Sequence, residues 1–226
     1  MISVHPLRPG AAERHDEWCR QLRRRRDEFA LSRRAVGVTR QAFWLQPDHE
    51  LVVVRTDADD PLHALRRLRD ATDRFDLWYR RQELAVHGTA LVDAGDPPEL
   101  LTDDRSGEVG ADDLFVAWAV PLAPGRTGAY RDGIATGDGL DRTRRWGLKR
   151  MAIWLQHVAG RDVVVHELAG DIPAMVRRLT QDQDPEIHRQ REFLRESFAI
   201  ELYGGNVPLP VPTFAWSAIR ARTGAR

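Results

Sequence analysis

The sequence has few of the features that mark exported, membrane or nucleic-acid-binding proteins. Among its 226 residues there is a single cysteine, Cys19, which cannot form an internal disulfide and indicates a reducing cytoplasm. No apolar run approaches the roughly 18 residues of a membrane-spanning helix, and no charged start followed by an apolar run suggests export. We therefore expect a cytoplasmic protein that does not span a membrane.

The sequence also has no excess of charge of either sign. The 34 lysines and arginines balance the 34 aspartates and glutamates, so no overall field favours nucleic acid or an anionic membrane. Lys149 is the only lysine, and the other 33 cationic residues are arginines, a bias that indicates a GC-rich bacterial genome. The expected partner is a small molecule.

Metal-binding signatures are absent as well. The sequence contains no HExxH, no paired HxxxH and no Cys/His cluster. Asp184, His188 and Glu192 lie at one-turn spacings, which is typical of an exposed polar helix face as well as of a metal site. We expect no metal and no tightly bound cofactor.

What the sequence does contain is an internal repeat. Residues 36–46 return as residues 146–156, and Trp-Leu-Gln ends both stretches. Each copy continues with a β-branched run, an aspartate at a helix entry (Asp60 or Asp171) and an Arg-Arg-Leu triplet. Because a repeat of roughly 100 residues is the size of a compact domain, the chain should contain two fused units.

Hydrophobic periodicity predicts the order β-α-β-β-α-β in each unit. In the first unit, Trp18, Leu22 and Phe29 mark the buried face of the first helix. The other expected elements of this unit are a hairpin of strands 38–46 and 50–56, a helix that begins at Asp60, and a last strand near 84–92.

The second unit should begin with a strand at 114–120. Its first helix contains several glycines and should be short, because each glycine weakens a helix by up to about 1 kcal/mol. The expected boundaries are 1–92 for the first unit, 93–113 for a linker, 114–203 for the second unit, and 204–226 for an extended tail. This tail should lie across the body or on a neighbouring subunit of a homo-oligomer.

The predicted order β-α-β-β-α-β occurs twice, and Trp-Leu-Gln ends the second strand of each copy. In these features the chain resembles the dimeric α/β barrel superfamily. The resemblance implies an α+β fold of two ferredoxin-like units fused in tandem. Their antiparallel sheets would face each other and form a pseudo-dimeric barrel. The superfamily includes cofactor-free monooxygenases, polyketide cyclases, isomerases and haem enzymes, and no residue set here matches one of these subfamilies.

Side chains alternate across a strand, so the repeated strand has two different faces. Phe43 and Leu45, with Ile153 and Leu155, form an apolar face that should pack beneath helices. The opposite face would line the barrel and offers aromatic walls, amides and positive charge to a planar or acidic ligand. The predicted substrate-binding residues there are Arg40, Trp44, Gln46, Arg150, Trp154 and Gln156.

Two histidines interrupt the symmetry of the repeat. The register of the repeat makes His166, which follows one β-branched run, the counterpart of Arg55, which follows the other. The same register makes Trp118 and Val120 the counterparts of Ser3 and His5. Imidazole titrates near neutral pH, so His5 and His166 are the candidate catalytic acids or bases. Trp118 joins the predicted substrate-binding set.

These features favour a small-molecule enzyme that transfers protons on a hydrophobic aromatic or polycyclic substrate, as a cyclase or isomerase does. The sequence leaves two alternatives. One is a cofactor-free monooxygenase, and the other is a non-catalytic ligand-binding or oligomer-forming protein with a filled barrel. An open pocket edged by a titratable residue would favour an enzyme.

Overall fold

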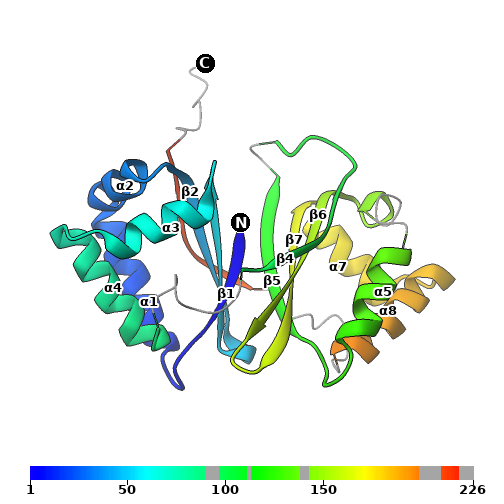
Figure 1. Cartoon of the computed structure of the whole chain (residues 1–226). Coiled ribbons are helices and arrows are strands. Elements are labelled where there is room, and N and C mark those ends of the chain that lie inside the picture. Colours follow the sequence, from blue (N-terminus) through cyan, green and yellow to red (C-terminus); the bar gives the residue numbers. More distant parts are fainter. Residues whose placement is uncertain (90–96, 111–112, 138–142, 199–209, 219–226) are drawn as a thin grey trace, which may run out of the picture. The chain divides into compact units, whose positions relative to one another are not determined.

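The structure is a computed structural model, and it describes residues 1–89, 97–110, 113–137, 143–198 and 210–218. The chain separates into two compact units (Figure 1). Unit 1 comprises Met1–Pro97 together with Val211–Arg226, and unit 2 comprises Pro98–Pro210. Each unit has a four-stranded antiparallel sheet covered by helices on one face. The predicted α+β class and its two ferredoxin-like units are confirmed.

Unit 1 orders its strands β1-β3-β2-β8. Its α3 helix begins as predicted, because Asp60 accepts a hydrogen bond from the backbone N–H of His63 at 2.9 Å. The region read as one first helix is two helices that meet at Arg25. The elements are β1 (Ile2–Pro6), α1 (Ala12–Arg24), α2 (Arg26–Ala35), β2 (Val38–Gln46), the 3-10 turn η1 (Pro47–His49), β3 (Leu51–Ala58), α3 (Pro61–Asp70), α4 (Arg74–His87) and β8 (Val211–Ser217).

Unit 2 repeats this plan with the strand order β4-β6-β7-β5. Asp171 is the counterpart of Asp60 and accepts a hydrogen bond from the backbone N–H of Ala174 at 2.9 Å. The elements are β4 (Glu99–Arg105), β5 (Leu114–Pro121), α5 (Thr127–Thr136), β6 (Leu148–Val158), β7 (Arg161–Gly170), α7 (Ile172–Gln181) and α8 (Pro185–Phe198).

The strand that follows the last helix of each half joins the sheet of the other unit. β4 follows α4 but pairs with β6 of unit 2, and β8 follows α8 but pairs with β2 of unit 1. Both added strands cover a sheet edge, which would otherwise expose unpaired backbone groups.

This exchange corrects three sequence predictions. The strand expected near 84–92 is wrong, because α4 continues through His87 and ends where Gly88 adopts φ 82°. The expected linker at 93–113 contains β4, and the expected tail at 204–226 contains β8. The rest of that tail, residues 204–209 and 219–226, lies outside the described residues, so its contact with a second subunit stays a prediction.

The alternation along the repeated strand is confirmed. Phe43 and Leu45 belong to the apolar core of unit 1, and Ile153 and Leu155 belong to that of unit 2. Each such buried side chain stabilises its unit by about 1.5 to 3 kcal/mol. The facing of the two sheets stays a prediction.

Candidate functional site

Neighbouring residues of β7 point to opposite faces of the sheet of unit 2. His166 lies opposite Ile153 in the ladder with β6, whereas Glu167 lies opposite Ala152. Ile153 packs in the core between sheet and helices. Because residues paired across a ladder share a face, His166 faces the helices and Glu167 faces the other way.

The predicted correspondence of His166 with Arg55 is therefore wrong by one residue. Ala42 is the counterpart of Ala152 and lies opposite Arg55, so Arg55 corresponds to Glu167. Aligning the β-branched runs at their ends caused the error, since one run is four residues long and the other three. A shift of one residue moves a strand side chain to the other face of its sheet.

His166 is buried and contacts Tyr130 of α5. Its Nε2 atom lies 3.1 Å from the Tyr130 hydroxyl oxygen. The residue as a whole is only 6% exposed. The Trp118 and Phe198 rings lie 5.7 and 5.8 Å from the imidazole, measured between ring centroids. The structure thus brings together His166 and Trp118, two of the predicted site residues.

A small, partly open space, called the inner cavity below, adjoins this histidine. It has a volume of about 30 Å³ and is bounded by His166, Tyr130, Trp146, Gln190 and Phe193 together with apolar side chains. Among the described residues, the indole nitrogen of Trp146 and the Oε1 atom of Gln190, both in this lining, are buried without a hydrogen-bond partner. Buried polar groups in proteins nearly always have a partner, so these atoms mark a place where a ligand or water would bind.

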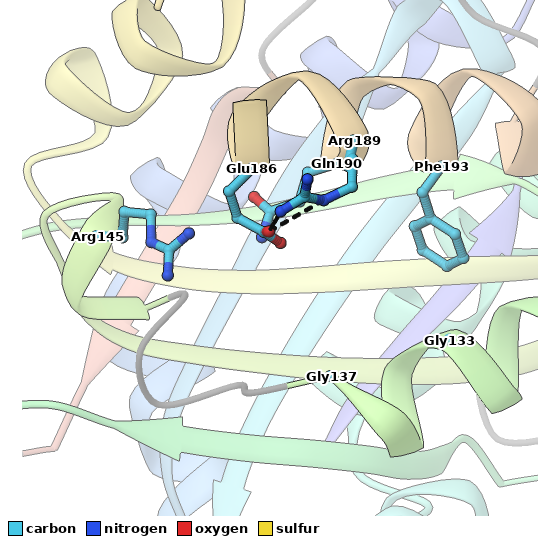
Figure 2. A pocket seen from close by; sticks show the side chains of 7 residues that line it. All are labelled: Gly133, Gly137, Arg145, Glu186, Arg189, Gln190 and Phe193. Carbon is cyan, nitrogen blue, oxygen red and sulfur yellow. Dashed lines mark hydrogen bonds and ion pairs between the residues drawn. The ribbon is translucent and has the colours of Figure 1, made fainter. Parts of the chain in front are cut away.

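A larger depression, the outer pocket, lies next to the inner cavity. Its volume is about 240 Å³, just below the usual 300 to 1,000 Å³ of small-molecule sites. Gln190 and Phe193 line both spaces. Figure 2 shows Phe193 and Arg145 at opposite ends of the outer pocket, with Gln190 between them on α8.

Phe193 lines both spaces, and the lack of a Cβ atom on Gly133 leaves room for its ring. A Cβ atom on Gly133 would lie 2.5 Å from the Cε2 atom of Phe193, closer than any real contact. The Phe193 ring also stacks on Tyr130 with centroids 5.5 Å apart and an interplanar angle of 19°. Phe193 is thus packed between Gly133 and Tyr130 where the two spaces share a wall.

The charges at the outer pocket are unequal. Arg189 forms an ion pair with Glu186 through two nitrogen contacts to Oε2. Arg145 has no side-chain hydrogen bond or ion pair within the described residues, and its side chain is exposed. Within the described residues, the positive charge of Arg145, at the end of the pocket opposite Phe193, therefore has no carboxylate partner.

The other face of unit 2 holds an ion-pair network rather than a histidine. Arg150 donates to Glu167 Oε1 at 2.8 Å and to Asp103 Oδ1 at 2.7 Å. Trp154 Nε1 lies 3.3 Å from Glu167 Oε2, and Gln156 is buried further along β6. Burial alone would lower the pKa of Arg150, but its two carboxylate partners raise it. These hydrogen bonds occupy polar groups of Arg150 and Trp154, two residues that were predicted to bind substrate.

The corresponding residues of unit 1 are arranged differently. Arg40 is exposed and lies 3.8 Å from the Asp57 carboxylate, which also accepts a hydrogen bond from Arg55 at 2.7 Å. Trp44 and Gln46 are buried. A chamber shared by both copies of these residues stays a prediction.

His5 belongs to a buried histidine cluster in unit 1. Its ring lies 5.9 Å from that of His87, which lies 6.3 Å from that of His15. His5 Nε2 is 2.9 Å from Ser3 Oγ, and His15 Nε2 is 3.0 Å from Thr213 Oγ1 of β8.

The cluster is held neutral by its surroundings. Burial lowers the pKa of His15 to about 3 and that of His87 to about 4, and burial together with His87 lowers the pKa of His5 well below its ordinary value. No cavity among those described is lined by His5. The predicted catalytic role of His5 stays a prediction.

The described residues contain neither a metal-binding cluster nor a membrane-spanning helix. No group of three or more histidine, cysteine, aspartate or glutamate side chains there is placed to hold a metal ion. His188, proposed with Asp184 and Glu192, lies exposed on α8. None of the described helices has the length and apolar character needed to cross a membrane.

Several residues of the site were missed from the sequence. Tyr130 and Ile134, four residues apart in α5, carried a helical signal that the surrounding glycines obscured. Gln190 and Phe193 come from α8, and nothing in their spacing indicated a cavity. Only packing of α5 and α8 on the sheet brings them to His166.

Comparisons with known proteins add a fold but no close relative. No protein-family model matches the sequence, and no curated protein does. A solved structure described as a crystal structure study of an anthrone oxidase-like protein is similar over 99% of this chain and 95% of that chain. The two share 12% sequence identity and superpose with a TM-score of 0.52. At this identity the likeness is one of fold, and it extends over nearly the whole chain.

Proposed function

We propose that the chain is a small-molecule enzyme that moves a proton on a hydrophobic aromatic substrate bound in unit 2. The observation that carries this proposal is the contact of 3.1 Å between His166 Nε2 and the Tyr130 hydroxyl at the wall of the inner cavity. This is a titratable residue beside a pocket, the feature expected of an enzyme rather than of a filled barrel.

The two side chains have different roles in this proposal. His166 is the base or acid, because a positioned imidazole transfers protons efficiently near neutral pH. Tyr130 orients the imidazole, and its hydroxyl can donate to an oxygen that gains negative charge when the substrate loses a proton. Trp118 and Phe198 give the imidazole an apolar surrounding.

The substrate class rests on shape and on fold likeness. The outer pocket ends at Phe193, whose ring offers a flat apolar surface. The fold is similar to that of a protein described as anthrone oxidase-like, which favours a polycyclic ketone or phenol. In anthrone, the methylene group opposite the carbonyl is acidic, so its deprotonation would be the first step of either isomerisation or oxidation.

Anthrone therefore separates the two enzymatic alternatives. Without oxygen, proton transfer alone would exchange the methylene hydrogens for deuterium in D₂O. With oxygen, a cofactor-free monooxygenase would turn the methylene into a carbonyl. One oxygen atom of O₂ would enter the product, and the other would leave as water with the two methylene hydrogens.

The test measures both reactions with the native chain and with His166→Ala. We expect exchange above the uncatalysed rate, reduced by about 100-fold or more in the variant, with folding nearly intact. Activity equal to that of the native chain in a folded His166→Ala variant would overturn the role of His166. Binding of polycyclic compounds with neither reaction would favour the non-catalytic alternative.

A further inference from the structure

Arg145 gives the outer pocket a charge that the proposed proton transfer does not use. It stands at the opposite end from Phe193 (Figure 2), and within the described residues no carboxylate pairs with it. The other arginine of the pocket, Arg189, is already neutralised by Glu186. The pocket thus has an apolar end and a cationic end.

We propose that the outer pocket binds an aromatic carboxylate, with the ring system on Phe193 and the carboxylate on Arg145. This inference deepens the proposed function by naming the substrate class, and it rests on that function only in placing the reacting part of the ligand near His166. A guanidinium presents parallel N–H donors that match the two oxygens of a carboxylate.

The unpartnered atoms beside Phe193 support the placement of the ring system. Trp146 is only 7% exposed, and its indole nitrogen has no hydrogen-bond partner among the described residues. The Oε1 atom of Gln190 is likewise buried, with no hydrogen-bond partner in the described part of the chain. A hydroxyl or carbonyl on the ring system would accept from the Trp146 indole, and a hydroxyl would donate to Gln190.

The size of the pocket limits the ligand. A volume of about 240 Å³ accepts a bicyclic or tricyclic body. The inner cavity of about 30 Å³ has room for little more than a water molecule while Phe193 is in place. If the Phe193 side chain rotates, the ring system of the ligand can reach toward His166.

Two matched probes test the charge preference without any turnover. These are 2-naphthoate, which carries a carboxylate, and 2-naphthalenemethanol, which has the same rings and no charge. Calorimetric titration of the full chain should show naphthoate binding about tenfold more tightly at low ionic strength, with the difference shrinking as salt rises. Equal affinities for the two probes would overturn the proposal.

Arginine variants locate the charge. Arg145→Gln should remove the preference for naphthoate and leave binding of the alcohol unchanged. Arg177→Gln is the matched control, because Arg177 is an exposed arginine of α7 that does not line the pocket. The same loss in both variants, or no loss in Arg145→Gln, would contradict the assignment.

The indole N–H signal of Trp146 reports where the probes bind. Its NMR resonance is identified by its disappearance in Trp146→Phe, and naphthoate should shift it at saturation. A Trp146 signal that does not move while naphthoate binds would place the site elsewhere and refute the proposal. His166→Ala should retain naphthoate binding, so failure of the catalytic proposal and failure of this one are distinguishable.

Discussion

Arg150 donates a hydrogen bond of 2.8 Å to Glu167, on the sheet face opposite to His166. The sequence suggested that His166 and Arg150 share a chamber, and the ladder between β6 and β7 separates them. The guanidinium of Arg150 on this face is therefore paired with two carboxylates. His166 lies on the helix side of the sheet with Tyr130.

Glu167→Ala should destabilise unit 2 by roughly 3 kcal/mol, because it leaves the partly buried Arg150 guanidinium without one of its two carboxylates. Urea unfolding measures the loss. In a double-mutant cycle with Arg150→Ala, the two losses should be less than additive. Strictly additive losses would show that the ion pair contributes nothing.

Tyr130→Phe should reduce proton exchange by about 10-fold to 100-fold, because it removes the hydroxyl beside His166 Nε2. The ring keeps its contacts with Phe193 and Phe198, so the loss of stability should stay near 1 kcal/mol. Exchange rates and thermal melting are measured on the same samples. A variant that exchanges at the native rate would remove Tyr130 from the mechanism.

Stability should fall as the pH drops below about 6.5, because the three buried histidines of unit 1 bind protons more readily when the chain is unfolded. Their folded pKa values are lowered, to about 3 for His15 and about 4 for His87. The destabilising slope is about 1.4 kcal/mol per pH unit for each histidine between its unfolded and folded pKa.

Asp76 acts in the opposite direction over part of this range. Burial raises its pKa to about 6, so the folded state takes up its proton first and gains stability as the pH falls toward 4. Urea unfolding between pH 7 and pH 4 gives the net slope. His87→Gln should flatten it, whereas His188→Gln, an exposed control on α8, should not. If the native chain lost no stability between pH 7 and pH 4, the conclusion that the histidine cluster is neutral would be wrong.

Trp216→Ala should destabilise the protein by about 3 to 5 kcal/mol, because this side chain of β8 is buried against Phe29 in the core of unit 1. Val211→Ala on the same strand is the control, since Val211 is half exposed. Chemical unfolding compares the two variants. Similar small losses in both would show that β8 does not belong to this core.

Local patterns in the sequence were enough to predict the repeated strands, their apolar faces and the helix starts at Asp60 and Asp171. These features depend on residues close in the chain: alternation along a strand, and a carboxylate that caps the next helix. The two units follow from the repeat for the same reason. Each copy contains its own pattern.

Tertiary structure alone decided the register of β7, the partners of β4 and β8, and the pocket around His166. The β-branched runs of the two copies differ in length by one residue, so a sequence alignment can match them at either end. Only the hydrogen-bonded ladder fixes which of His166 and Glu167 faces the helices. The edge strands pair with sheets distant in the chain, where no local signal exists. The site joins side chains from α5, β7 and α8, which only the packing of these elements brings together.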